Sequence, residues 1–170
     1  MNEEQLFFSK NIKDFLDEAA GKTLKYICFD INPPYDFKNA NLNFKFRYAL
    51  RVFFSMEHGD FRMACSDTSD GLSALYVEKC TFPNNDNKCD EKLDVNAIFG
   101  KSETYLSKEG LIEKLKITCG QTTWTFIPAE IYLKSDGNFR YVKNDEMVFV
   151  FDNDEEVSNF EKELKATDNL

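Results

Sequence analysis

The chain has 170 residues, of which 30 are acidic and 21 basic, so it carries a net charge of −9 at neutral pH. Hydrophobic residues make up 42% of the chain, which argues against an intrinsically disordered protein, and the acidic N-terminus with no long apolar run argues against a secretory signal or a membrane span. A single histidine leaves little equipment for proton transfer or metal binding near neutral pH. We expect one domain over residues 1–170 that is cytoplasmic, binds a partner, and uses neither a cofactor nor a metal.

The first segment, residues 3–20, has the spacing of an amphipathic helix. Gly21 is a suitable residue to end it. A strand is expected at 22–31, and the tandem prolines Pro33 and Pro34 should break it because they donate no backbone hydrogen bond. The apolar stripe of the expected helix consists of Phe8, Ile12, Phe15, Leu16 and Ala19.

Residues 42–56 show the clearest pattern in the chain. Every even position is apolar, while most odd positions are polar or basic, which predicts a long strand with one buried face. A turn at His58-Gly59-Asp60 leads to a return strand over 61–65. Asp70-Gly71 then reverses the chain before a further strand over 72–77.

The middle of the chain is less regular. Residues 81–91 read as a polar loop, and 93–99 as an edge strand or an irregular segment. Ser107 is a candidate N-cap for a short central helix that contains Leu111, Ile112 and Leu115 and ends near Gly120.

The last third predicts four strands and a helix. The strands are expected at 122–127, 129–134, 139–143 and 147–151, with Asn144-Asp145-Glu146 as an interruption. Asp152 or Asp154 would cap a final helix with the apolar stripe Val157, Phe160 and Leu164. The whole pattern predicts an α+β fold, in which an antiparallel meandering sheet packs against an N-terminal, a C-terminal and a short central helix.

The main candidate for a catalytic residue is His58, because the many carboxylate pairs carry little information in so acidic a chain. A small hydrolase is conceivable if His58 pairs with Cys65 or Ser55, although no recognised nucleophile signature surrounds them. A zinc site from His58, Cys80 and Cys89 can also be drawn, but their spacing matches no standard ligand pair. The five cysteines include no Cys-x-x-Cys pair and are expected to be reduced thiols.

Basic residues occur on the polar positions of the 42–56 strand. Lys45, Arg47 and Arg51 lie there among aromatic residues, as in some RNA-binding strands, but the aromatic side chains alternate onto the other face. The net negative charge also opposes phosphate contacts. We therefore expect no direct binding of nucleic acid.

Acidic residues are concentrated near the C-terminus. Between residues 136 and 170 there are ten acidic and four basic side chains, and a second acidic group surrounds the predicted hairpin turns. Such a distribution would speed the association of a basic protein. The alternative is that these charges only keep the protein soluble.

The order of these features resembles small immunity proteins of bacterial polymorphic and contact-dependent toxin systems. The resemblance lies in the N-terminal amphipathic helix, the aromatic meander, Trp124, the run Leu133-Lys134-Ser135-Asp136-Gly137-Asn138-Phe139 and the acidic end. It implies a cytoplasmic protein that neutralises a cognate toxin, often a basic nuclease, by covering its active site or a neighbouring surface.

The expected function is therefore inhibition of a basic toxin domain, without contact to nucleic acid or membrane. Exposed Tyr or Phe side chains would anchor the interface beside its charges. Alternatives are the His58 hydrolase and a small-ligand-binding or structural α+β module with a partly open apolar sheet face. The acidic residues expected to face Lys and Arg of the toxin are Asp67, Asp70, Asp145, Glu146, Asp152, Asp154, Glu155 and Glu156.

Overall fold

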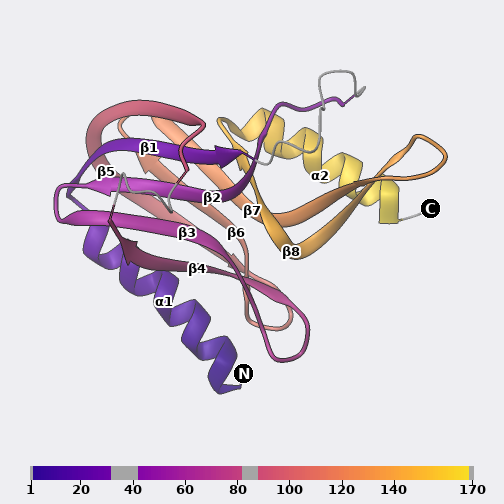
Figure 1. Ribbon diagram of the computed structural model, residues 1–170, viewed down its shortest axis with the longest axis horizontal. Coiled ribbons are helices and arrows are strands. Elements are labelled where there is room, and N and C mark those ends of the chain that lie inside the picture. The colour runs from indigo at the N-terminus through magenta and orange to yellow at the C-terminus, as the bar shows by residue number, and fades with distance from the viewer. Residues whose placement is uncertain (1, 32–41, 82–87, 169–170) are drawn as a thin grey trace.

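The computed structural model describes residues 2–31, 42–81 and 88–168, and it has the α+β architecture that the sequence predicts (Figure 1). Within these residues, a helix comes first, eight antiparallel strands follow, and a second helix comes last. The elements are α1 (Glu3–Ala19), β1 (Thr23–Ile31), β2 (Arg47–Met56), β3 (Gly59–Asp67), β4 (Ser73–Cys80), β5 (Glu91–Leu106), β6 (Ile112–Cys119), β7 (Thr122–Leu133), β8 (Phe139–Phe151) and α2 (Asp154–Asp168).

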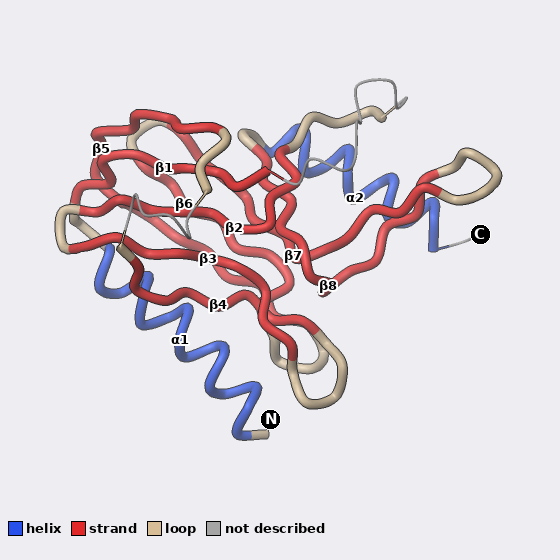
Figure 2. The backbone as a smooth tube through the Cα atoms, in the orientation of Figure 1, coloured by secondary structure: helices blue, strands red, loops and turns tan. Residues whose placement is uncertain are grey.

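The strands form one highly connected sheet with the order β1-β5-β6-β7-β8-β2-β3-β4. Because β1 also pairs with β2, the first six strands of this order close into a ring, and β3 and β4 continue from β2. Two strands pair with the same edge of β2, because residues 47–49 pair with β8 and residues 52–56 pair with β3. Figure 2 shows α1 along one side of this sheet and α2 beside the β7–β8 hairpin.

The main hydrophobic core lies inside the ring and is closed by α1. Phe15 of α1 reaches Phe54, Phe61 and Phe99, with ring centroids 5.2–5.9 Å away. The buried stripe of α1 is the one expected from the sequence, and Asn2 starts the helix through a capping box with Gln5. The packing of this stripe fixes α1 against the sheet between β4 and β5.

A second hydrophobic core lies between α2 and one face of the β7–β8 hairpin. Phe160 is fully buried at its centre and contacts four aromatic rings. The other members from α2 are Val157 and Leu164, which confirms the stripe expected for the final helix. This small core fixes the hairpin that extends away from the ring in Figure 1.

The predicted central helix is wrong, because its residues form a turn and β6. Leu111 and Ile112 have helical spacing with Leu115, but the alternation of buried residues continues through Ile117 and Cys119, which is the pattern of a strand. Ser107 caps the turn instead. Its backbone N–H donates to the carbonyl of Leu111 at 2.8 Å, and its hydroxyl accepts from the Leu111 N–H at 3.3 Å.

Other boundaries also differ from the expected ones. Residues 42–46 precede β2 rather than belonging to it, because Phe44 turns into the second core and the Lys45 N–H donates to Glu156 of α2. The four strands expected after residue 122 are two long ones, β7 and β8. The segment 93–99 is part of a longer strand, whereas the proline break at 33–34 and most of the 81–91 loop lie outside the described residues. In the described part of the chain, no helix is both long and apolar enough to cross a membrane.

Candidate acidic interface

A bulge in β8 carries two of the predicted partner-binding acids. Pro128 of β7 faces Val148 of β8, but the next residue of β7, Ala129, faces Lys143, so residues 144–147 of β8 have no partner on β7. Asn144 begins the bulge in the left-handed region with φ of 54°. The Asp145 carboxylate accepts a hydrogen bond from the backbone N–H of residue 146 at 2.8 Å. The bulge therefore turns Asp145 and its neighbour out of the β7–β8 pairing.

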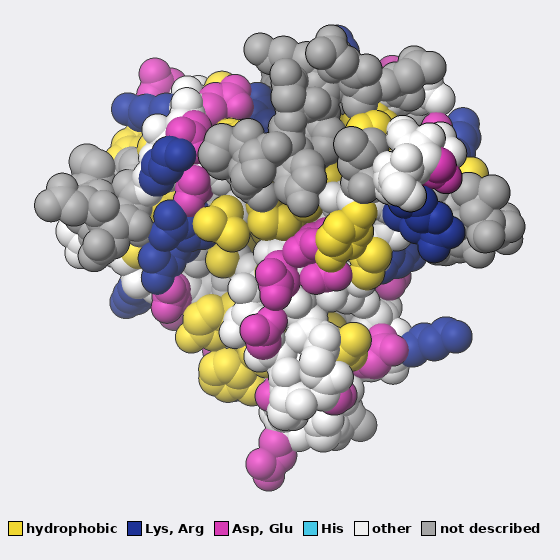
Figure 3. Space-filling view, turned by 45° about the vertical axis from the view of Figure 1, so that its right-hand side comes forward, with side chains coloured by type: hydrophobic (Ala, Val, Ile, Leu, Met, Phe, Trp, Pro, Cys, Tyr) yellow, Lys and Arg dark blue, Asp and Glu magenta, His cyan; other side chains and the backbone are white. Residues whose placement is uncertain are grey.

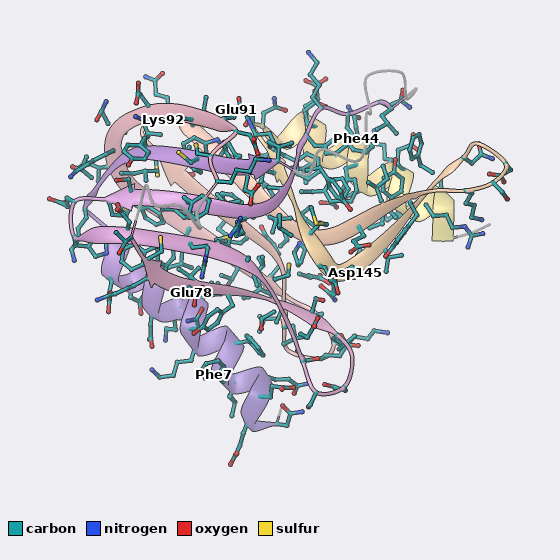
Figure 4. The ribbon with its side chains drawn as sticks, in the orientation of Figure 1. Phe7, Phe44, Glu78, Glu91, Lys92 and Asp145 are labelled. Atoms are coloured by element: carbon teal, nitrogen blue, oxygen red, sulfur yellow. The ribbon has the colours of Figure 1, made fainter. Side chains whose placement is uncertain are left out.

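Four carboxylates gather around this bulge and are called here the acidic patch. They belong to Asp67 at the end of β3, Glu130 on β7, and Asp145 and Glu146 on the bulge. All four raise the pKa of the nearby Cys65 thiol, although burial is the larger cause. The Cys65 Sγ also lies 3.6 Å from the carbonyl oxygen of Met147, next to the bulge. Figure 4 shows Asp145 at the bend of β8, and Figure 3 shows acidic side chains close together near the centre of this face.

Like charges lie near one another in the acidic patch. The pKa of Glu130 is raised chiefly by partial burial and, to a smaller extent, by the negative charges of Asp145 and Glu146, while the hydrogen bond from the Tyr132 hydroxyl lowers it. Tyr132 itself has a raised pKa, because its hydroxyl bonds to Glu130 and faces Asp145, whose carboxylate lies 3.5 Å away. Within the described residues, none of the four carboxylates has a basic partner within 4 Å.

An exposed aromatic and apolar surface lies beside the acidic patch. In the β7–β8 register, Glu130 faces Val142, and Tyr132 faces Arg140, so these four residues share one face of the hairpin. Tyr132 is 40% exposed and Val142 is 42% exposed. The opposite face of the hairpin is buried against α2. The hairpin thus presents a tyrosine next to carboxylates, the combination expected of an interface anchor.

The acids near the start of α2 are used inside the protein. An Asp152 oxygen lies 2.5 Å from Arg47 Nη1, and an Asp154 oxygen lies 2.8 Å from Lys116 Nζ. Glu156 accepts a hydrogen bond of 2.5 Å from the backbone N–H of Lys45. These contacts join the start of α2 to β2, to β6 and to the segment before β2, and negative charge at a helix start also suits the helix dipole. We assign them a structural role, which distinguishes them from the acidic patch.

The remaining two predicted acids are exposed and lie elsewhere. Glu155 is in the first turn of α2. Asp70 is in the turn between β3 and β4, three positions after Asp67. This turn is attached to α1, because the backbone N–H and the hydroxyl of Ser69 both donate to the Glu4 carboxylate at 3.0 Å.

The residues of the hydrolase hypothesis do not come together. His58 lies in the turn between β2 and β3, packs its ring 4.9 Å from that of Phe61, and has a pKa lowered chiefly by burial. Cys65 is further along β3, roughly 20 Å from the turn at about 3.3 Å per residue. The hydroxyl of Ser55 donates to Asp60 at 2.9 Å. Over the described ranges, neither ring nitrogen of His58 has a hydrogen-bond partner, and no three His, Cys, Asp or Glu residues are grouped to hold a metal ion.

Two components of the site were not foreseen from the sequence. Glu130 and Tyr132 lie in a predicted strand, where their alternation placed them on one face, but nothing local indicated that this face is exposed. Their proximity to Asp145 depends on the register of β7 with β8 and on the bulge. Comparison with known proteins adds no relative, because no family model, curated protein or solved structure matches the chain.

Proposed function

We propose that the protein is a cytoplasmic inhibitor of the immunity type, which binds a basic toxin domain through the acidic patch. The observation that carries the proposal is the group of four carboxylates without basic partners among the described residues, beside the exposed Tyr132. A chain that needed these charges only for solubility would gain nothing from placing them against one another. Burial is the main cause of the raised pKa of Glu130, and the charges of Asp145 and Glu146 add to it.

A basic partner would relieve this repulsion. A Lys or Arg side chain placed between Glu130 and Asp145 would favour their ionised forms and would gain charge-assisted hydrogen bonds. The negative field would speed the encounter, by a factor of about 10 to 1,000 for strongly steered pairs. Tyr132 and Val142 would then supply the apolar contact that slows dissociation.

This proposal moves the interface from the end of the chain to the β7–β8 hairpin. Of the eight acids expected from the sequence, Asp67, Asp145 and Glu146 remain in it, and Glu130 is added. Asp70 and Glu155 are peripheral to it. Asp152, Asp154 and Glu156 act within the fold through the contacts described above.

A comparison of two variants with equal net charge tests the proposal. The first neutralises the acidic patch through Asp67→Asn, Glu130→Gln, Asp145→Asn and Glu146→Gln. The second neutralises four exposed acids elsewhere, through the substitutions Glu3→Gln, Glu18→Gln, Glu109→Gln and Glu155→Gln.

Each tagged protein is expressed at its native level in the native host and purified, and its companions are identified by mass spectrometry. We expect the wild type and the control variant to retain an equimolar basic protein that the patch variant loses. The purified companion should be toxic on its own and neutral in the complex. A companion retained equally by both variants, or no companion at all, contradicts the proposal.

A further inference from the structure

The second half of β5 has an unused edge. Residues 91–98 of β5 pair with β1, whereas residues 99–106 pair with β6. The pairing on the β1 side ends at Phe99, whose N–H and carbonyl bond to the backbone of Lys22 and Gly21 at 2.8 Å. In the part of the chain that the structure describes, no strand pairs with this edge over residues 100–106. About 20 Å of strand therefore presents backbone N–H and C=O groups away from β6.

The helix α1 lies between β4 and β5, where a further strand could have paired with both. It makes hydrogen bonds with the backbone of β4 but leaves a gap on the side of β5. Towards β4, the Asn11 amide group donates to the carbonyl of Val77 and accepts from its N–H, both at 2.8 Å, so a side chain satisfies that strand edge. Towards β5, a groove of about 660 Å³ remains between the helix and the strand. Among the described residues, α1 therefore satisfies the β4 edge at Val77 and leaves the β5 edge without a backbone partner.

The floor of the groove is a row of core-facing positions that the described residues leave partly or largely exposed. Ser102, Thr104 and Leu106 face Ile117, Leu115 and Ile112 across the β5–β6 pairing, and therefore share one face with them. The three β6 residues are buried. Their β5 counterparts are not, and Leu106 is 47% exposed.

The α1 side of the groove adds apolar and basic groups. Leu6, which is 52% exposed, and Leu16 supply apolar surface. Lys10, Lys13 and Asp17 supply the charges, so two of the three charged side chains are basic in a chain with a net charge of −9. Lys10 also pairs with Asp14 on the helix at 2.6 Å. Because Lys10 is paired in this way, Lys13 is the basic side chain of the groove that has no acidic partner within 4 Å among the described residues.

We infer that the groove between α1 and β5 binds an extended segment of a partner protein, with alternating apolar and acidic residues, which adds a strand to β5. The free backbone edge selects an extended chain, because only such a chain can match its row of donors and acceptors. The apolar side chains would cover Leu6, Thr104 and Leu106. The acidic side chains, on the outer face, would meet Lys10 and Lys13. This inference is independent of the proposed function, which concerns another face.

The test uses an end-blocked, fluorescein-labelled peptide of four Val-Glu repeats and measures binding by fluorescence anisotropy. Lys13→Glu should weaken binding about fivefold or more, because it replaces an attraction by a repulsion. Lys162→Glu, on the exposed side of α2, makes the same change in net charge and should leave binding unchanged. A peptide of Val-Lys repeats should bind at least about fivefold more weakly to the wild type.

Backbone methylation of the peptide tests strand addition directly. Because alternate residues of a strand direct their N–H groups to the same edge, methylating the valine amides blocks one edge and methylating the glutamate amides blocks the other. We expect one of these two peptides to lose binding by about tenfold or more and the other to bind as before. Amide exchange of residues 100–106 should slow when the unmethylated peptide is bound.

Equal binding of both methylated peptides would overturn the inference, as would equal loss in the Lys13→Glu and Lys162→Glu variants. Failure of the acidic peptide to bind the wild type at all would also overturn it. So would sedimentation showing a dimer that the peptide dissociates, because a second copy of the chain would then be the occupant of the groove.

Discussion

Phe160 connects the stability of the second core to the position of the acidic patch. It is fully buried, and its ring centroid lies 4.8–5.5 Å from those of Phe149, Phe151, Phe44 and Tyr141. Phe160→Ala removes these contacts and leaves a cavity that the surrounding rings cannot fill. Substitutions of this kind cost about 3–5 kcal/mol. At about 2–4 °C per kcal/mol for a chain of this size, the melting temperature should fall by roughly 6–20 °C.

The assay combines urea unfolding, followed by circular dichroism, with amide hydrogen exchange. We expect exchange to accelerate first in α2 and in the β7–β8 hairpin, because the second core is a cluster of buried residues separate from the main core. Val142→Ala, on the exposed face of the same hairpin, serves as the control and should change stability by less than about 0.5 kcal/mol. A loss below about 1 kcal/mol for Phe160→Ala, or uniform acceleration in both cores, would refute this reasoning.

Three other substitutions or measurements test single contacts. Glu130→Gln should stabilise the protein at pH 7 by less than about 1 kcal/mol after allowance for solvent screening, because the raised pKa means that Glu130 costs stability only when it is ionised. This gain should vanish below about pH 4, and an equal gain at both pH values in thermal melts would count against the reasoning. Arg47→Ala should lower the free energy of unfolding, measured in urea, by about 2–3 kcal/mol, because it breaks ion pairs to both β5 and the start of α2. A loss under about 0.5 kcal/mol would show that these ion pairs are unimportant. In thiol titration at pH 8, the exposed Cys89 should react first. Cys28 and Cys119 should react slowly, because burial, together with the neighbouring Cys89 thiol in the case of Cys28, raises their pKa values to about 12 and about 11. A fast reaction of Cys28 and Cys119 would contradict the packing described here.

Local patterns were sufficient to predict most elements of the fold. The stripes of α1 and α2 each predicted a buried face that the structure has. The alternation that became β2 is confirmed only in part, because the pairing with β1 shifts near Leu50, which is 46% exposed, while Ala49 is buried. The error at residues 107–119 has the same origin, because three apolar residues satisfy a helical spacing over one turn, and only the longer run to Cys119 reveals the strand. β2 begins at Arg47 because α2, which is far away in the sequence, draws Phe44 out of the alternation.

The candidate site was less predictable, because it depends on strand pairing. The abundance of acids near the C-terminus predicts Asp145 and Glu146 of the bulge as partner-binding residues, and it predicts Asp152 equally. In the structure, however, Asp152 forms an ion pair with Arg47. No local signal distinguishes these two cases. Glu130 joins the acidic patch only because β7 and β8 pair with a shift at Pro128, and a shift of this kind is set by tertiary packing rather than by neighbouring residues.

The central claim is that the acidic patch steers and holds a basic protein. The most direct measurement is the association rate of the purified companion with the wild type and with the patch variant, by stopped flow, over a range of ionic strengths. We predict a wild-type rate that falls steeply with added salt, and a patch-variant rate that is about tenfold or more slower at low salt and nearly independent of it. Equal rates for the two proteins at low salt would contradict the account.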